Sequence, residues 1–190
     1  MTNTAKLNLS AKTTETAAPM AQEVLQQTEA SLGFVPNMYA YFANSPALLK
    51  SYTHSYDLFR KNTDFNGVEQ EVVFLTISRE NGCEYCMAAH SFVGDNMTNV
   101  PKGITEAIRG DQPLPDAKLN ALSELTKAVV VKRGNIEASD VEAFLQHGYN
   151  ETQILDVILA LSAKTISNYA NHILHTPVDA VFAGRAWTAK

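Results

Sequence analysis

Both cysteines of this 190-residue chain fall in one short stretch, together with a histidine that could act on them. Cys83 and Cys86 are spaced C-x-x-C, and His90 follows four residues after the second cysteine. On an α-helix, where successive residues turn by about 100°, the three side chains would project from one face. Thiols at i and i+3 can form a disulfide, and a histidine at i+4 can exchange a proton with the nearer thiol. The pattern predicts a redox dithiol with its own base.

A glutamate on the helix predicted before the cysteines is a second candidate for proton transfer. The helical period places Glu71 on the apolar face of this helix, whereas Glu69 and Glu80 are expected to point to water. A carboxylate on an apolar face is costly unless it is paired or its pKa is raised, and raised pKa values are typical of groups that move protons. The alternative is a structural ion pair with a cation such as Arg79 or Lys164.

Composition and charge exclude several classes of protein. Hydrophobic residues make up 45% of the chain and charged residues 18%, as in ordinary globular proteins. The net charge of −5 provides no basic surface for nucleic acid or for an anionic membrane. The sequence has neither an apolar run of transmembrane length nor the apolar core of a secretory signal. A C-x-x-C pair in such a chain indicates a reducing compartment, so we expect a cytoplasmic protein.

Apolar residues recur with the helical period over most of the chain, and strand signals are scarce. We therefore predict an all-α fold of roughly seven to nine helices. Residues 1–17 lack periodicity and are expected to form a flexible N-terminal arm, whereas residues 18–190 are expected to form a single helical domain. Helix starts are indicated by Ser45 before Pro46, Asn66 with Glu69, Ser139 with Glu142, and Asn150 with Gln153.

The dithiol has two competing interpretations. Cys83, Cys86 and His90 could be zinc ligands, with a fourth ligand from His172 or His175. Structural zinc usually stabilises small or loop-rich pieces, and this chain is long enough for a core without it, so we expect no metal. The two cysteines could also be small apolar side chains packed in the core. Their coincidence with a histidine and a core-facing glutamate favours the redox interpretation.

Polar residues also gather near the end of the last long predicted helix. Tyr169 and His172 lie about one turn apart, with Asn168 and Asn171 interleaved. These side chains are candidates to line the same pocket as the dithiol. Alternatively, they satisfy backbone groups near the end of the helix.

The order and spacing of four residues resemble a known family. Glu71, Cys83, Cys86 and His90 form the pattern E-x(11)-C-x-x-C-x(3)-H, which resembles the motif of the alkyl hydroperoxidase D-like (AhpD-like) family of the carboxymuconolactone decarboxylase superfamily. The segments GFVPNMYAYFANSPALLKSY and SNYANHILHTPVD also resemble that family, so the similarity covers residues 30–180. It implies an AhpD-like multi-helix bundle that assembles into homo-oligomers (a dimer, trimer or hexamer) and needs neither a metal nor an organic cofactor.

The resemblance also implies roles for the motif residues. The second cysteine of the family, here Cys86, is the peroxide-reactive thiol, and Cys83 resolves it and exchanges with the electron donor. Glu71 and His90 match the proton relay. One position departs from the family, because Tyr85 replaces a histidine and is a poor base at neutral pH. The helix terminus favours Cys83 as the lower-pKa thiol, but we follow the family and the histidine spacing in choosing Cys86.

We therefore expect an enzyme, a thiol-dependent peroxidase or disulfide reductase. Its expected partners are a peroxide substrate and a thiol electron donor, either a lipoyl domain, a thioredoxin-like protein or a peroxiredoxin. One alternative is a non-redox enzyme similar to the decarboxylases, which do not depend on a C-x-x-C pair. Another is a non-catalytic redox sensor, which oxidises once per stimulus instead of cycling with a donor.

Overall fold

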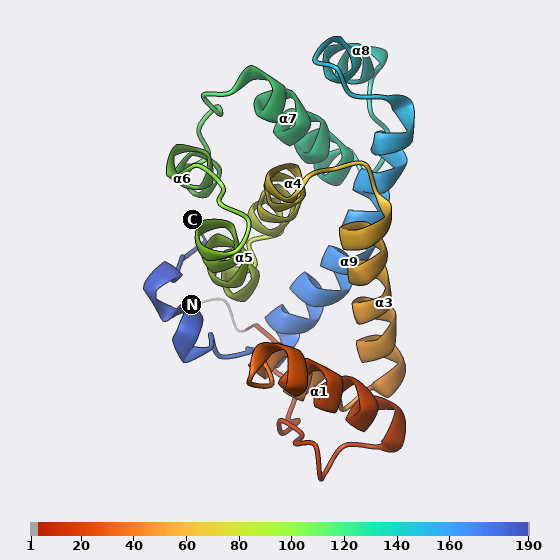
Figure 1. The fold of residues 1–190 in the computed structure, drawn as a ribbon, viewed down its shortest axis with the longest axis vertical. Coiled ribbons are helices and arrows are strands. Elements are labelled where there is room, and N and C mark those ends of the chain that lie inside the picture. The colour runs from red at the N-terminus through yellow and green to blue at the C-terminus, as the bar shows by residue number, and fades with distance from the viewer. Residues whose placement is uncertain (1–3, 190) are drawn as a thin grey trace.

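The computed structural model describes residues 4–189 and is helical throughout (Figure 1). Within that range there are nine α-helices, one short 3-10 helix and no strand, so the predicted all-α fold is confirmed. The helices are α1 (Pro19–Leu32), α2 (Asn37–Phe42), α3 (Pro46–Asn62), α4 (Gly67–Glu80), α5 (Glu84–Asn96), α6 (Lys102–Gly110), α7 (Ala117–Val131), α8 (Ala138–Gln146), α9 (Glu151–Leu174) and the 3-10 helix η1 (Ala180–Arg185). Among the described residues, no helix combines the length and the apolar character that crossing a bilayer requires.

Helix α4 lies at the centre of the molecule, in contact with α5, α6, α7 and α9 (Figure 1). Its start is fixed by the predicted capping box, which is confirmed. The Asn66 side chain accepts hydrogen bonds from the N–H groups of Val68 and Glu69, and the Glu69 carboxylate accepts from the Asn66 N–H, each at 3.0 Å. After α4, Gly82 takes φ +67°, a left-handed conformation that favours glycine. This sharp turn leads directly into the cysteine segment.

The central position of α4 overturns the expectation that Glu69 and Glu80 face water. Glu69 is 4% exposed and pairs with Lys118 at 3.1 Å. The Glu80 side chain is 12% exposed and pairs with Arg79 and, at 3.9 Å, with Lys127. Because helices surround α4, the side opposite its most apolar face is covered as well, and its carboxylates are paired instead of solvated.

The capping of α8 also differs from the prediction. The helix start is capped by Asp140, whose carboxylate accepts from the Glu137 N–H at 2.9 Å, and not by Ser139 and Glu142. Lys132 contacts the Glu137 and Asp140 carboxylates, at 3.2 Å and 2.6 Å, and so holds them at the start of the helix. A basic side chain from the end of α7 therefore sets the start of α8.

Two apolar clusters form the core, and the dithiol belongs to one of them. The first gathers around α4, α7 and the start of α9, with Phe74 among its buried members. The second contains both cysteines together with side chains of α1, α2, α3 and α9. Tyr56 of α3 packs against both clusters. The dithiol therefore lies in a dry region, close to the boundary between the two halves of the core.

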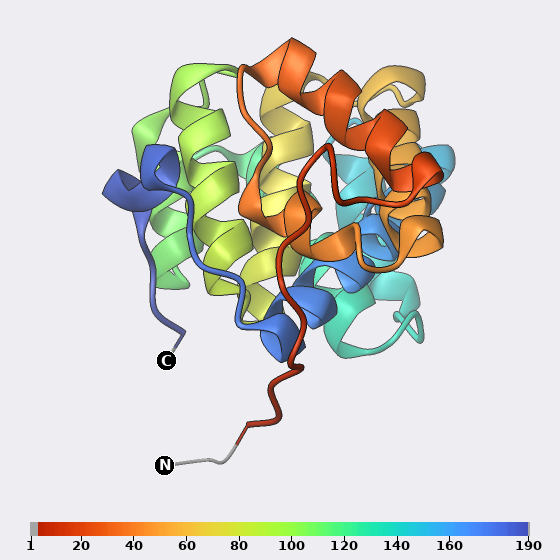
Figure 2. The same cartoon turned by 90° about the horizontal axis from the view of Figure 1, so that it is seen from below.

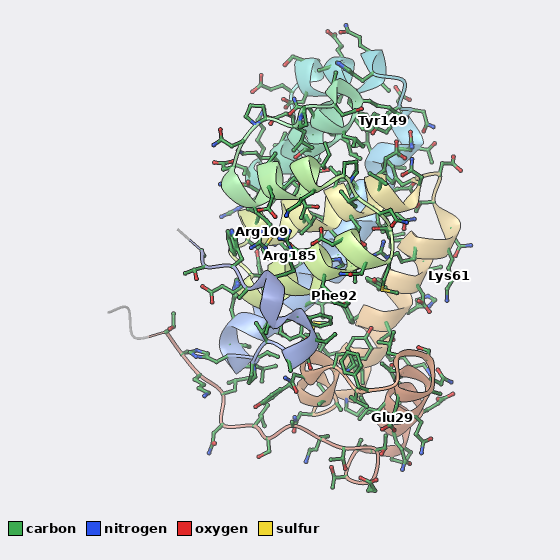
Figure 3. All side chains as sticks on the ribbon, turned by 60° about the vertical axis from the view of Figure 1, so that its left-hand side comes forward. Glu29, Lys61, Phe92, Arg109, Tyr149 and Arg185 are labelled. Atoms are coloured by element: carbon green, nitrogen blue, oxygen red, sulfur yellow. The ribbon has the colours of Figure 1, made fainter. Side chains whose placement is uncertain are left out.

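The C-terminal segment packs on α5 and covers it. Phe182 of η1 contacts Phe92, with ring centroids 5.4 Å apart. Arg185 pairs with Asp95 at 2.9 Å, and Arg109 donates a hydrogen bond to the Arg185 carbonyl at 3.1 Å. Figure 3 shows Arg109 and Arg185 next to each other, with Phe92 further along the same face. The segment predicted as a tail is thus anchored at several points.

The N-terminal residues 4–17 run across the end of α9 and past α2 (Figure 2). The Leu7 N–H donates to the Ile173 carbonyl, and the Lys12 N–H donates to the Ala40 carbonyl, both at 2.9 Å. These bonds attach the segment at two points. Its mobility, and the division of the chain at residue 18, stay predictions.

The capping box of α4 can be tested against a helix start that has no such bonds. Asn66→Ala removes the side-chain acceptor of two N–H groups, so the free energy of unfolding should fall by about 1 kcal/mol. Ser45, which was expected to cap α3, makes no capping hydrogen bond, and Ser45→Ala should change stability by less than about 0.5 kcal/mol. Urea unfolding of both variants measures the difference. Equal losses would contradict the assignment.

Candidate dithiol site

The two cysteines lie at the N-terminal end of α5. Because the helix begins at Glu84, Cys83 is its N-cap residue, one position earlier than the predicted first turn, and Cys86 lies in that turn. The Cys83 sulfur accepts a hydrogen bond from the Cys86 N–H at 3.4 Å. Both thiols are free and buried, with exposed fractions of 0% and 2%. The positive end of the α5 dipole favours a negative charge at this position.

Helix α9 supplies the polar groups that contact the sulfurs. The Asn171 amide donates to the Cys86 sulfur at 3.4 Å and lies 3.9 Å from the Cys83 sulfur. The Cys86 thiol can donate to Ser167, 3.9 Å away. Asn171 was a predicted pocket candidate, whereas sequence reasoning did not connect Ser167 with the dithiol. Its signal was its position, one turn before Asn171 on the buried face of the same helix.

The surroundings give the two thiols opposite pKa shifts. Burial by itself would raise the pKa of Cys86, but the hydrogen bond from Cys83 and the positive charge of Lys164 outweigh it and bring that pKa well below 9.0. Burial and the neighbouring Cys86 raise the pKa of Cys83 well above the same value. The lower pKa therefore belongs to Cys86, contrary to the helix-terminus argument for Cys83. The surroundings therefore favour the thiolate form at Cys86 and the protonated form at Cys83.

His90 is oriented by Glu71, as the motif predicts for a relay. The His90 Nδ1 lies 2.8 Å from a Glu71 carboxylate oxygen, and both side chains are buried. Burial and the charge of Lys164 lower the pKa of His90 below 6.5, so the imidazole is neutral at pH 7. A carboxylate can only accept, so the proton resides on Nδ1 and Nε2 is left as the basic nitrogen.

The second oxygen of Glu71 is paired with Arg60, a residue of α3. The same guanidinium donates to the Tyr56 hydroxyl at 2.9 Å and to the Gln70 side chain at 3.1 Å. Burial alone would raise the pKa of Glu71, but His90 and Arg60 outweigh burial and lower it. Glu71 is therefore ionised at neutral pH.

This pairing corrects two expectations about Glu71. Its pKa is lowered and not raised, and its cation is Arg60, not Arg79 or Lys164. Arg79 instead pairs with Glu80 and with an aspartate that follows α6. Sequence reasoning missed Arg60 because it lies near the end of another helix, and no periodicity within α4 identifies the helix that α4 faces.

The structure does not bring Tyr85 or His172 into contact with the relay. The Tyr85 hydroxyl donates to Asp179 at 2.5 Å and accepts from the Met38 N–H at 3.4 Å, which joins α5 to α2 and to the segment after α9. His172 is exposed and stacks on Tyr169, with ring centroids 6.5 Å apart. The ligand set considered for zinc is likewise not assembled. Within residues 4–189, no three His, Cys, Asp or Glu side chains are grouped so that they could hold a metal ion.

The buried ion pair predicts how acid should affect stability. Removing the charge of Glu71 leaves Arg60 without its counter-ion, so Glu71→Gln should lower the free energy of unfolding at pH 7 by about 3 kcal/mol. Because the pKa of Glu71 is lowered on folding, this stabilisation is complete above the ordinary value of 4.5 and is lost as the pH falls through the folded value. Urea unfolding at pH 7 and at pH 3.5 should show the difference between wild type and variant shrinking in acid.

Glu69→Gln is the matched control for that experiment. Glu69 lies two residues earlier on α4 and is also buried, but its partner Lys118 has a half-exposed side chain. An ion pair of this kind contributes roughly 1 kcal/mol or less. If Glu69→Gln lowers the free energy of unfolding as much as Glu71→Gln does, the Glu71 pair does not stabilise the fold more than an ordinary buried carboxylate.

No known family model matches the chain, and no curated protein matches it in sequence. Solved structures do match its fold. A crystal structure of an AhpD core, an uncharacterized peroxidase-related protein from Ralstonia eutropha JMP134, is 17% identical with a TM-score of 0.83, over 95% of this chain and 97% of that one. An uncharacterized peroxidase-related protein from Silicibacter sp. TM1040 is 22% identical with a TM-score of 0.76, over 96% of each chain.

The same fold is found in the debrominase Bmp8. Its apo structure is 14% identical with a TM-score of 0.76, over 94% of this chain and 96% of that one. At these identities the comparisons establish the architecture. The resemblance expected from the sequence is confirmed at that level, and the chain has the AhpD-like helical fold.

Proposed function

We propose that the chain is a thiol-dependent peroxidase or disulfide reductase, in which Cys86 is the attacking thiol and Cys83 the resolving thiol. The observation that carries this proposal is the contrast between the two thiols. They are adjacent at the start of one helix, and the pKa of Cys86 is lowered while that of Cys83 is raised. A thiolate attacks a peroxide, whereas a thiol condenses with the resulting sulfenic acid. The site favours the thiolate at Cys86 and the thiol at Cys83.

The proposed reaction proceeds in two steps on the protein. The Cys86 thiolate attacks one peroxide oxygen, the O–O bond breaks, and the leaving oxygen takes up a proton to give an alcohol or water. The resulting sulfenic acid on Cys86 then reacts with the Cys83 thiol, which forms the disulfide and releases a second water molecule. Two electrons pass from the dithiol to the peroxide.

His90 is suited to carry the proton in this scheme. Its Nδ1–H donates to the ionised Glu71, so Nε2 can accept a proton from the attacked peroxide or from water and give it to the leaving oxygen. Arg60 holds the charge on Glu71 and thereby keeps the imidazole in one orientation. In this proposal Glu71 orients the base and does not itself take up the proton.

An external dithiol must then reduce the disulfide. In thiol exchange the leaving thiol with the lower pKa departs faster, so the donor is expected to attack the Cys83 sulfur and release Cys86. The turn before Cys83 is suited to this approach, because Asn81 and Gly82 line a surface hollow of about 330 Å³ together with Trp187 and Ala189. The proposed donor is a lipoyl domain, a thioredoxin-like protein or a peroxiredoxin, in a reducing compartment such as the cytoplasm.

The expected homo-oligomer is supported by one exposed face of α9. Leu155, Ile158, Tyr169 and Ile173 are 44–66% exposed, and at about 100° per residue they fall within about 60° of one another around the helix. Exposed apolar side chains that gather on one face in this way are typical of interaction surfaces. We propose that a second copy of the chain covers this face.

Reductive debromination is the second candidate reaction, because Bmp8 has the same fold. A cysteine-to-alanine variant of Bmp8 was crystallised with 2,3,4-tribromopyrrole. A dithiol that becomes a disulfide supplies two electrons, which is what replacing a carbon-bound bromine by hydrogen requires, with release of bromide. Peroxide remains the favoured substrate because the two sulfurs are 0% and 2% exposed, and a small oxidant reaches them with less rearrangement.

The first test of the proposal is the fate of the two thiols. One equivalent of hydrogen peroxide should remove two titratable thiols and two mass units, and dithiothreitol should restore both. In Cys83→Ser a sulfenic acid should be trapped on Cys86 by dimedone, and Cys86→Ser should show no peroxide turnover. Thiols that stay reduced with peroxide but are oxidised by 2,3,4-tribromopyrrole with bromide release would favour debromination. A trapped adduct on Cys83 alone would reverse the two roles.

The second test separates the two candidate relay groups. His90→Gln removes the base and should slow single-turnover oxidation of Cys86 by about a hundredfold. Tyr85→Phe should oxidise nearly as fast as the wild type, because the Tyr85 hydroxyl contacts Asp179 and not the relay. Stopped-flow mixing with hydrogen peroxide measures both rates. A large loss in Tyr85→Phe with little change in His90→Gln would show that the tyrosine has taken over the role of the family's histidine.

A further inference from the structure

Lys164 is fully buried, and among the described residues its Nζ has no hydrogen-bond partner. Its recorded neighbour is the Phe74 ring, whose centroid lies 5.5 Å from Nζ. A buried ammonium group without an acceptor is costly, and such groups are normally paired. A lysine that packing alone explained would extend its amine to water. Lys164 therefore lacks the negative partner that its charge requires.

The position of Lys164 places its amine beside the dithiol. At about 100° per residue, Lys164 lies about 180° around α9 from the exposed Leu155, at the middle of the buried face. Ser167 and Asn171, about one and two turns further along this face, contact the Cys86 sulfur. The Phe74 ring that Lys164 touches also contacts His90, with ring centroids 4.8 Å apart. Lys164 thus shares a helix face with the groups that contact the Cys86 sulfur, and it touches the same ring as the base.

A second unpartnered donor lies next to Lys164. Asn168 follows it by four residues on α9 and is fully buried. Its Oδ1 accepts from the Asn81 side chain at 2.8 Å, which fixes the amide, and its Nδ2 has no hydrogen-bond partner in the described part of the chain. Two buried donors without acceptors therefore face the same region. A group with negative charge would satisfy both.

The charges around the site point to the same conclusion. Arg60 and Glu71 balance each other, and burial keeps His90 neutral. Among residues 4–189, Lys164 then adds a positive charge to this buried region for which no hydrogen-bond acceptor is present. A thiolate at Cys86 would neutralise it, whereas a neutral thiol would leave it unpaired.

We propose that Lys164 is the counter-ion of the Cys86 thiolate, and that its positive charge, not an imidazolium at His90, keeps this buried sulfur anionic. The distinction matters for the chemistry. If His90 were the counter-ion, it would already be protonated and could not act as a base. With Lys164 in that role, the thiolate and the neutral imidazole coexist. The shifts support this arrangement, because the charge of Lys164 is among the causes that lower the pKa of both Cys86 and His90.

Several other groups contribute to the pKa of Cys86 and must be held constant in a test. Those that act on the sulfur are Cys83, Tyr85 and His90 from α5 and its cap, Tyr52 from α3, and Lys164 from α9, whereas Glu71 and Arg60 act on His90. Cys83→Ser provides a background with a single thiol, in which the other groups are unchanged. In that background the ultraviolet absorbance of the thiolate reports Cys86 directly as a function of pH.

The decisive comparison is between Lys164→Met and His90→Gln in the Cys83→Ser background. Lys164→Met should raise the apparent pKa of Cys86 by about one unit or more, a tenfold loss of thiolate at pH values below it. His90→Gln should change it much less. Lys118→Met removes a half-exposed lysine that pairs with Glu69, and should leave the titration unchanged. A shift in His90→Gln with none in Lys164→Met would overturn the proposal.

Thermal unfolding separates this role from a structural one. In Lys164→Met the Cys86 thiolate can take up a proton, so no buried charge is left unpaired, and the melting temperature should stay close to that of its Cys83→Ser parent. A lower melting temperature combined with an unchanged thiol pKa would show that Lys164 serves the fold, and would refute the inference. If Lys164→Met does not fold, the same titration on Lys164→Gln decides.

The inference deepens the proposed function, but its test is independent of that function. The titration contains no peroxide and no electron donor. A protein whose thiol pKa depends on Lys164 but which never forms a disulfide with peroxide would refute the peroxidase and retain the counter-ion. A protein that is oxidised by peroxide and reduced again by a donor, but whose thiol pKa does not depend on Lys164, would refute the counter-ion and retain the peroxidase.

Discussion

The charge on Glu71 is the constraint on which the rest of the site depends. It is fully buried at the boundary between the two apolar clusters, where α3, α4 and α5 meet. Burying a carboxylate there is tolerable only because Arg60 pairs with one oxygen and His90 binds the other. Once that charge is fixed, the imidazole has one tautomer and one orientation. Because Arg60, Glu71 and His90 come from three helices that pack together, the ion pair holds the base in a defined position.

The site and the fold make opposite demands on α9. Along most of its length this helix is apolar, and its buried face fills the space behind the dithiol. At Lys164 and Asn168 the same face carries polar groups that lack partners, which is unfavourable for folding. Residues that lower the stability of a core, with no structural feature that compensates the loss, are typical of functional sites. The position of this imbalance, next to the two sulfurs, connects it with their chemistry.

Helical periodicity was sufficient for the parts of the site that lie on one element. It placed Cys86 and His90 on one face, assigned Glu71 to the core, and identified the start of α4 from Asn66. It failed where a residue depends on a neighbouring helix. Arg60 reaches Glu71 from α3, and Glu69 and Glu80 are covered because α4 lies at the centre of the fold.

The same limit applies to Lys164 and to the cap of α5. The sequence offered Lys164 only as a possible partner of Glu71, because its neighbours follow from how α9 crosses α4 and α5, which periodicity does not determine. The position of Cys83 differed from the prediction by one residue. At a helix end, one residue separates an N-cap, which accepts backbone hydrogen bonds, from a member of the first turn.

The comparisons place different chemistries on one scaffold, since proteins described as peroxidase-related and as a debrominase share this fold at low sequence identity. A dithiol with a nearby base can supply two electrons and a proton to different oxidants, for example a peroxide or a brominated ring. Selection among acceptors must therefore arise from what can reach the sulfurs. Here both sulfurs are buried in one apolar cluster with Met38 of α2, Tyr85 of α5 and Phe182 of η1. Substrate choice in this chain is thus expected to reside in the residues that bury the sulfurs, which differ in kind from the motif that first identified the site.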